Sequence, residues 1–308
     1  LRMRWLGIVI LLLGSTLAQE NPPDYDWDEP TRLDEYVHED DGYYEWELLD
    51  TYDLNGVTCY ILNMTSQNWI GEHYLDRHIW WHHFVIAVPD EIRDNTAGVL
   101  GITGGDNTDP IPTPDTPIAA LTISFANATK TVVGSVLQVP NQPTVFANDP
   151  DSKSRREDSI IAWTWRTAVD DPDQGQDWVA RLPFTKAAKR SMDLIQEFTQ
   201  SVRPETDINR FLVTGASKRG WTAWSIAATD KRVIAAAPMV FSMLNAPETL
   251  MKHYQALGGA WSFAFSPYYN EDLTYHLLEY EELAHLYDME DMIRYRSRLT
   301  MPKLLIVA

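Results

Sequence analysis

FLVTGASKRGW, residues 211–221, carries the strongest structural signal in this sequence. Residues 211–214 predict a buried strand, and residues 218–229 predict a helix that follows it directly. Ser217 then lies at a tight strand-to-helix turn, which raises the hydroxyl above the carboxyl edge of the sheet and needs small neighbours. We therefore predict that Ser217 is a catalytic nucleophile.

The start of the following helix provides electrostatic support for this prediction. The backbone amide of Lys218 comes directly after the serine and is the expected donor to a developing oxyanion. The motif departs from Gly-x-Ser-x-Gly, because Arg219 occupies the last glycine position and Gly220 comes one residue later. The alternative interpretation is that Ser217 only caps the helix.

A second glycine-rich turn follows an earlier predicted strand. Thr103-Gly104-Gly105-Asp106-Asn107 comes after the apolar run 98–103. In a hydrolase sheet, the loop at this place donates the second oxyanion amide, and glycine lets the backbone approach the substrate closely. We predict the Gly105 amide as that donor, with a plain turn as the alternative.

Strand-like and helix-like segments alternate through the middle of the chain. This order predicts an α/β fold, with a mainly parallel sheet covered by helices on both faces in the manner of the α/β-hydrolases. The expected strands are 83–88, 98–103, 131–139, 211–214 and 233–240, and the expected helices are 118–129, 184–202 and 218–229. The whole α/β domain is expected to span residues 51–308.

Residues 245–300 interrupt this alternation. They are aromatic and helical in pattern, which predicts a cap inserted over one end of the sheet, with an aromatic pocket lined by Trp261, Phe263, Phe265, Tyr268 and Tyr269. Residues 301–308 then begin one more buried strand, so we expect the chain to be C-terminally truncated, and this fragment to be inactive by itself.

In an α/β-hydrolase triad the order along the chain is serine, then acid, then histidine. The acid and the histidine are therefore expected beyond residue 308. The histidines that do follow Ser217 are interpreted as cap residues: His253, His276 and His285.

The first fifty residues predict secretion. Residues 1–18 combine Arg2 and Arg4, an apolar run and a small-residue cleavage site, as in a signal peptide; an uncleaved signal anchor is the alternative. Residues 19–50 are expected to form an extended acidic arm, since thirteen acidic residues stand there against one arginine. Asn63 and Asn127 each begin a glycosylation sequon. No further membrane span is expected after signal removal.

Composition excludes several classes of function. Among the 308 residues, 44 are acidic and 25 are Lys or Arg, and a net charge of −19 argues against nucleic-acid binding. Cys59 is the single cysteine, expected to be a buried apolar residue. Nothing indicates a cofactor or a metal: the His78, His82 and His83 segment is strand-like, and the loop from Asp171 to Asp177 lacks a completing acidic ligand of a calcium site.

Four segments resemble the PhoPQ-activated pathogenicity-related protein family, which includes autocrine proliferation repressor proteins. They are RLDEYV at 32–37, TGGDN at 103–107, RLPFTKAAKRSMD at 181–193 and LVTGASKRGWTAW at 212–224. The resemblance implies a secreted protein of α/β-hydrolase type with Ser217 as the nucleophile if the protein is catalytic. It also implies an acid just after a strand like 301–308, followed later by the histidine.

Two functions remain open at this point. The first is a secreted serine hydrolase that cleaves an ester or amide bond of a small molecule or peptide. The second is a non-catalytic secreted signalling or binding protein of growth-repressor type on a hydrolase scaffold, with a cell-surface protein as its partner.

Overall fold

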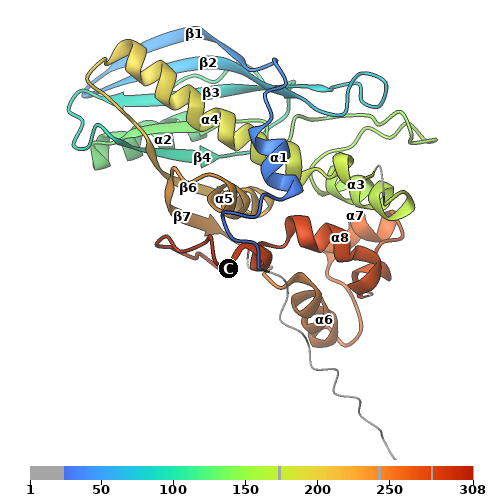
Figure 1. Cartoon of the computed structure of the whole chain (residues 1–308). Helices are drawn as coiled ribbons and strands as arrows, with labels where there is room; N and C mark the ends of the chain where they lie inside the picture. Colours follow the sequence, from blue (N-terminus) through green and yellow to red (C-terminus); the bar gives the residue numbers. More distant parts are fainter. Residues whose placement is uncertain (1–23, 173–174, 242–243, 279, 308) are drawn as a thin grey trace, which may run out of the picture.

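The computed structural model describes residues 24–307 apart from 173–174, 242–243 and 279, and the side chains of 280–282 are not described. The predicted signal peptide, residues 1–18, lies outside the described residues. Figure 1 shows one sheet with helices on both sides and a helical region at one end.

Seven strands form a single mixed sheet in the order β1-β2-β3-β5-β4-β6-β7. The first three are antiparallel neighbours, and β5, β4, β6 and β7 are parallel to one another. The strands are β1 Glu45–Leu54, β2 Val57–Asn68, β3 Ile79–Pro89, β4 Ala97–Ile102, β5 Val132–Val136, β6 Arg210–Ala216 and β7 Val233–Met239. The predicted mainly parallel sheet is therefore confirmed, with an antiparallel part in addition.

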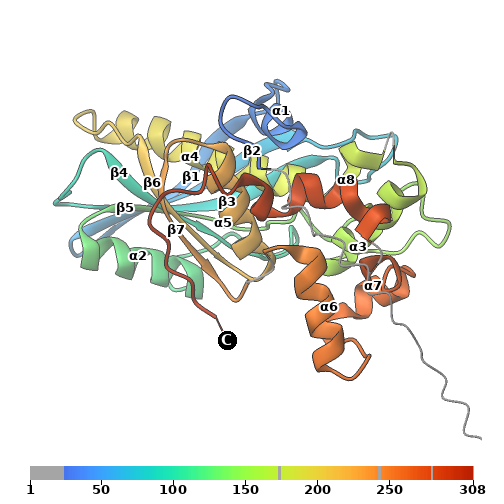
Figure 2. The same cartoon turned by 60° about the horizontal axis from the view of Figure 1, so that its bottom comes forward.

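Helices cover the two faces of this sheet. Figure 2 shows α2 (Pro117–Thr129) on one face and α4 (Arg181–Val202) and α5 (Lys218–Thr229) on the other. The α2 side is a thin layer in which Ala119 packs with Cys59, which is buried as predicted. The opposite face carries the main core, where large aromatic and aliphatic side chains of α4 and α5 pack on the strands. Helix α3 (Asp158–Asp170) extends this core toward the end of the sheet that carries Ser217.

The region predicted as a helical cap contains short helices joined by turns and irregular segments, with no strand among its described residues. Its elements are α6 Ala246–Ala256, η2 Phe263–Phe265, α7 Ser266–Asn270, η3 His276–Leu278, α8 Tyr280–Glu290 and η4 Met292–Tyr295. It joins the body through an aromatic cluster in which Trp165 of α3 contacts Tyr268 and Tyr287. None of the helices in the described part of the chain combines the length and apolarity that a membrane crossing requires.

Residues 303–306 run parallel to β7, which places them where one more strand was predicted. Two isolated bridges join Lys303 to Ala236 and Ile306 to Met239. The predicted burial is not observed, since Leu304 to Val307 are all exposed. Backbone hydrogen bonds to β7 hold this segment at the edge of the sheet.

The predicted extended arm over residues 19–50 is corrected in its described part. Residues Arg32–His38 form helix α1, which opens with a capping box between Thr31 and Asp34, and β1 begins at Glu45. The high number of acidic residues suggested an extended arm, but the apolar residues of this segment have a helical spacing. Leu33, Tyr36 and Val37 lie on one face of α1 and are buried. Arg298 anchors the segment: its buried guanidinium donates to the carbonyls of residues 25, 26 and 29 and to the Asp34 carboxylate.

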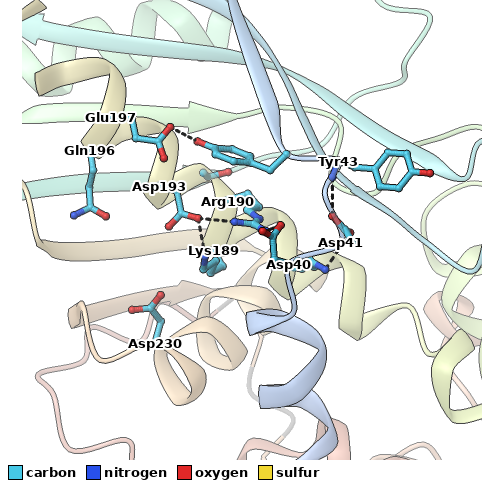
Figure 3. A network of polar contacts seen from close by, with 12 residues as sticks. Asp40, Asp41, Tyr43, Lys189, Arg190, Asp193, Gln196, Glu197 and Asp230 are labelled. Atoms are coloured by element: carbon cyan, nitrogen blue, oxygen red, sulfur yellow. Dashed lines mark hydrogen bonds and ion pairs between the residues drawn. The ribbon is translucent and has the colours of Figure 1, made fainter. Parts of the chain in front are cut away.

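The linker between α1 and β1 is tied to α4 by charges (Figure 3). Asp40 pairs with Arg190 at 3.3 Å, and Asp41 pairs with Lys186 at 3.0 Å. Arg190 also reaches Asp193, which in turn pairs with Lys189. The acidic residues of the arm thus have specific partners on the body of the protein.

Candidate active site

Ser217 lies between β6 and α5 in a conformation that L-residues rarely adopt. Its backbone has φ 57° and ψ −125°, its amide donates to the Met239 carbonyl at 2.9 Å, and its own carbonyl accepts from Trp221. A non-glycine residue in such a conformation is strained and persists only where the surrounding structure enforces it. Although Ser217 occupies the N-cap position, its side chain makes no capping hydrogen bond. The alternative of a simple helix cap therefore lacks its defining contact.

Gly215 and Gly220, the two glycines on either side of Ser217 in the sequence, make this turn possible. A Cβ on Gly215 would lie 2.5 Å from the Arg219 carbonyl oxygen and 2.9 Å from the Arg219 Cβ. A Cβ on Gly220 would lie 2.8 Å from the Met239 carbonyl oxygen. Arg219 is accommodated because Gly215 has no side chain, and the second glycine is required one position later, where α5 passes the end of β7.

The loop after β4 lies against the turn that carries Ser217. A Cβ on Gly104 would be 2.5 Å from Nη2 of Arg219, so the guanidinium passes directly over this glycine. Gly105 has φ +130°, and its carbonyl accepts from Gln142 Nε2 at 3.1 Å. Within the described residues the Gly105 amide donates no hydrogen bond. The structure thus brings the two predicted oxyanion segments, at Gly105 and Lys218, into one neighbourhood.

Glu157, which no sequence motif indicated, binds the two basic residues after Ser217. Its carboxylate accepts from Arg219 at 2.5 and 2.6 Å and lies 2.8 Å from Lys218 Nζ. These cations hold the pKa of Glu157 at about 2, against the opposing effect of burial. Asp158 also contacts Lys218, at 3.0 Å. No local motif marks Glu157, because it precedes the serine by sixty residues; only the unusual Arg219 in the glycine position hints at a partner.

A groove of about 620 Å³ opens beside Ser217 on the α2 face of the sheet. Its walls are mostly apolar and come from α2 and strands β4 to β7, with Leu121 and Phe125 exposed. The predicted pocket of cap aromatics is not formed: Phe263 is 91% exposed, Tyr269 is 68% exposed and Tyr268 belongs to the core. The cap packs through Tyr268 onto Trp165 of α3, and Trp261 packs against Phe265 within the cap.

The histidines do not reach Ser217 in the described structure. His253 stacks on Trp261, and His276 lies beside Arg166. His285, whose pKa is lowered by burial, lines a separate cavity with the N-terminal segment. No hydrogen bond joins any described side chain to the Ser217 hydroxyl.

His82 and His83 belong to strand β3, as their strand-like neighbours predicted, and His78 lies just before its first residue. His82 is fully buried, bonds to Ser66 Oγ at 3.0 Å and to the Leu137 carbonyl, and its pKa falls to about 4 through burial. His83 Nδ1 pairs with the Gln138 amide.

Of the two sequon asparagines, Asn127 is exposed on α2, whereas Asn63 is half-buried on β2 with its Nδ2 directed at Glu47.

The chain belongs to the PhoPQ-activated pathogenicity-related protein family, whose model matches residues 33–308. Autocrine proliferation repressor protein A of Dictyostelium discoideum is 35% identical over 272 residues, which cover 88% of this chain and 53% of that protein. The chain therefore spans about half the length of the curated relative that it matches. The resemblance inferred from the four sequence segments is confirmed.

A solved esterase structure shares the fold of this chain. An acetyl xylan esterase from Paenibacillus sp. R4 superposes with a TM-score of 0.50 at 14% identity, over 94% of this chain and 92% of that chain. Acetyl Xylan Esterase 1 from Thermoanaerobacterium sp. JW/SL YS485 gives 0.47 at 16% identity, over 93% and 88%. The predicted α/β-hydrolase scaffold is confirmed, and at this level of identity the likeness concerns the fold alone.

Proposed function

We propose that this member of the PhoPQ-activated pathogenicity-related protein family is a secreted serine hydrolase that cleaves an ester or amide bond through Ser217. One observation carries the proposal: Ser217 keeps a strained backbone conformation at a strand-to-helix turn while its side chain caps nothing. Strain of this kind clusters at functional sites, and exposing a nucleophile above the sheet edge is one such function.

The reaction follows from the groups around the serine. Ser217 Oγ attacks the carbonyl carbon, its proton passes to a base, and the carbonyl oxygen takes up the negative charge. The amides of Lys218 and Gly105 stabilise that oxyanion; the latter is unused within the described structure. Collapse of the adduct expels an alcohol or amine, which takes the proton, and water then releases the acyl group. Since no described histidine contacts Ser217, the proposal takes the base and its acid from outside the described residues.

The test is labelling of the full gene product with a fluorophosphonate probe. Wild-type protein and Ser201→Ala, which removes an exposed serine of α4, should be labelled, whereas Ser217→Ala should not. Equal labelling of Ser217→Ala, or none of a folded wild-type protein, would contradict the proposal.

Secretion forms a separate part of the proposal. It is supported by the apolar run between Arg4 and Gly14 and the small residues before Gln19. Protein recovered from the medium of a eukaryotic host should begin near Gln19, and Leu12→Arg should keep the protein inside the cell. A medium protein that retains Leu1 would contradict cleavage.

A glycan on the exposed Asn127 should disappear in Asn127→Gln. Asn63 offers a less accessible acceptor, because its amide nitrogen is directed at Glu47 on the neighbouring strand. The measurement is the mobility shift of the secreted protein on treatment with a glycan-removing amidase, compared between the two asparagine variants. An unshifted wild-type protein would contradict glycosylation.

A non-catalytic growth repressor is the second candidate, favoured by the name of the Dictyostelium relative. Its partner would be a protein at the cell surface. The two candidates separate in a proliferation assay with purified protein. If Ser217→Ala represses growth as well as the wild type does, the activity needs no nucleophile; if repression is lost while the variant stays folded, catalysis is required.

A further inference from the structure

Glu157 repeats the backbone conformation of Ser217. Its φ of 54° and ψ of −126° match the φ of 57° and ψ of −125° at Ser217. Each residue directly precedes a helix, α3 or α5, and neither side chain caps its helix. Because a glutamate in this conformation is strained, its surroundings must hold it there.

The carboxylate of Glu157 holds the side of the site that carries Ser217. Arg219 donates from both terminal nitrogens, one to each carboxylate oxygen, in the bidentate arrangement that fixes orientation as well as distance. Lys218 adds a third contact at 2.8 Å. Lys218 and Arg219 follow the serine directly, so the carboxylate fixes the first turn of α5.

The same carboxylate also holds the Gly104–Gly105 loop. Gln142 Nε2 donates to Glu157 Oε1 at 2.8 Å and to the Gly105 carbonyl at 3.1 Å. The Glu157 amide donates back to Gln142 Oε1 at 2.8 Å. In addition, the Arg219 guanidinium covers Gly104 and donates to the Val139 carbonyl at 2.6 Å. Glu157 is therefore connected to both segments that carry the proposed oxyanion amides.

We propose that Glu157 is a positioning residue that keeps the Gly105 and Lys218 amides at a fixed separation around the oxyanion of the Ser217 reaction. The inference rests on the proposed hydrolase function. Donors act on an oxyanion only when they are held in place before the charge develops, and a site 1 Å too wide loses much of their effect. Glu157 takes no part in proton transfer, because both of its oxygens are already occupied by cations and an amide.

The experiment measures how fast a fluorophosphonate labels Ser217 in the full gene product. Glu157→Gln keeps the shape and removes the charge. It should lower the second-order labelling rate by about 100-fold, the effect of losing one oxyanion donor, while the protein stays folded. Asp158→Asn is the matched control: it removes a contact to Lys218 alone and should leave the rate close to wild type.

A second variant keeps the inference testable if the Glu157→Gln protein does not fold. Gln142→Ala breaks the connection to Gly105 and leaves the ion pairs to Lys218 and Arg219 in place. It should also lower the rate, by a smaller factor. A merely structural role would instead lower the melting temperature of these variants and leave the labelling rate of the folded protein unchanged.

Hydrogen exchange of residues 103–107 separates this inference from the proposed function. If the wild type is labelled and Glu157→Gln reacts at the same rate, the positioning role is overturned and the hydrolase stands. If the folded wild type is not labelled, the hydrolase proposal fails, and the exchange data then test separately whether Glu157 holds the loop. Faster exchange in Glu157→Gln than in Asp158→Asn then shows that Glu157 holds the loop; equal exchange overturns that role too.

Discussion

Two sets of charges flank the first turn of α5, and they differ in burial. Beneath the turn, Arg181 and Glu290 are almost fully buried, at 0% and 1% side-chain exposure, with 3.6 Å between Nε and Oε2. Above it, Glu157 is 36% exposed where it pairs with Arg219. The buried pair links the body to the cap, whereas the half-buried pair links the start of α3 to the first turn of α5 at the candidate active site.

The partners of the buried pair explain its role. Arg181 donates to the Lys218 carbonyl at 3.1 Å and stacks over Trp221 at 4.0 Å, so it supports the turn from below. Glu290 accepts from the indole of Trp165 at 2.6 Å. Deep burial makes each charge dependent on the other, because an unpaired ion in the interior is costly. The buried pair therefore maintains the fold, while the pair at the candidate active site sets local geometry.

The largest effect is expected from breaking the buried pair. Glu290→Ala leaves the Arg181 guanidinium without its counter-charge and should lower the free energy of unfolding by about 3–5 kcal/mol, measured by urea denaturation. The control is Glu248→Ala, which breaks an exposed pair with Lys252 and should cost about 0–1 kcal/mol. Similar losses from the two variants would show that burial does not distinguish the regions.

A smaller effect is expected from filling the space that shapes the turn. Gly215→Ala places a methyl group against the Arg219 backbone and should destabilise the protein by about 3 kcal/mol, near the upper end for overpacking. Gly42→Ala serves as the control, since open space surrounds that glycine and only its positive φ opposes a side chain, for about 1 kcal/mol. If Gly215→Ala is tolerated as well as Gly42→Ala, the turn is looser than described.

The smallest expected effects are those of pH on the free energy of unfolding, and they should have opposite signs in the two regions. Burial raises the pKa of Glu290 from 4.5 to about 7, so the stability of the wild type relative to Glu290→Gln should fall as pH rises from 4.5 to 7. Arg219 and Lys218 lower the pKa of Glu157 to about 2, so the stability relative to Glu157→Gln should fall as pH drops from 4.5 toward 2. Urea denaturation across pH measures both, and slopes of the same sign would contradict the assignment.

Much of the fold was predictable because periodic apolar segments report burial directly. The pattern indicated β4, α2, β5, α4, β6, α5 and β7 close to their observed bounds. Strand β1 was not predicted because most of its side chains are exposed, so its sequence shows no alternation of apolar and polar residues. A signal was present nonetheless: Asn55-Gly56 joins β1 to β2, and this dipeptide favours a two-residue hairpin turn.

The candidate site was predictable only in its local parts. Ser217 and the Gly104–Gly105 loop follow strands in sequence, so motif and position indicate them together. Glu157 and Gln142 act across the fold through side-chain contacts, and no spacing in the sequence records such contacts. The groove was not predicted for a similar reason, since its walls come from α2, α5 and strands β4 to β7, which are far apart in the sequence.

The nucleophilic role of Ser217 is tested most simply by mapping the fluorophosphonate adduct on the folded full gene product by mass spectrometry. Trypsin releases residues 211–218 as one peptide, with Ser217 as its only serine. The added mass should reside on this peptide, at Ser217. An adduct on another residue, or none on a protein that is demonstrably folded, would contradict it.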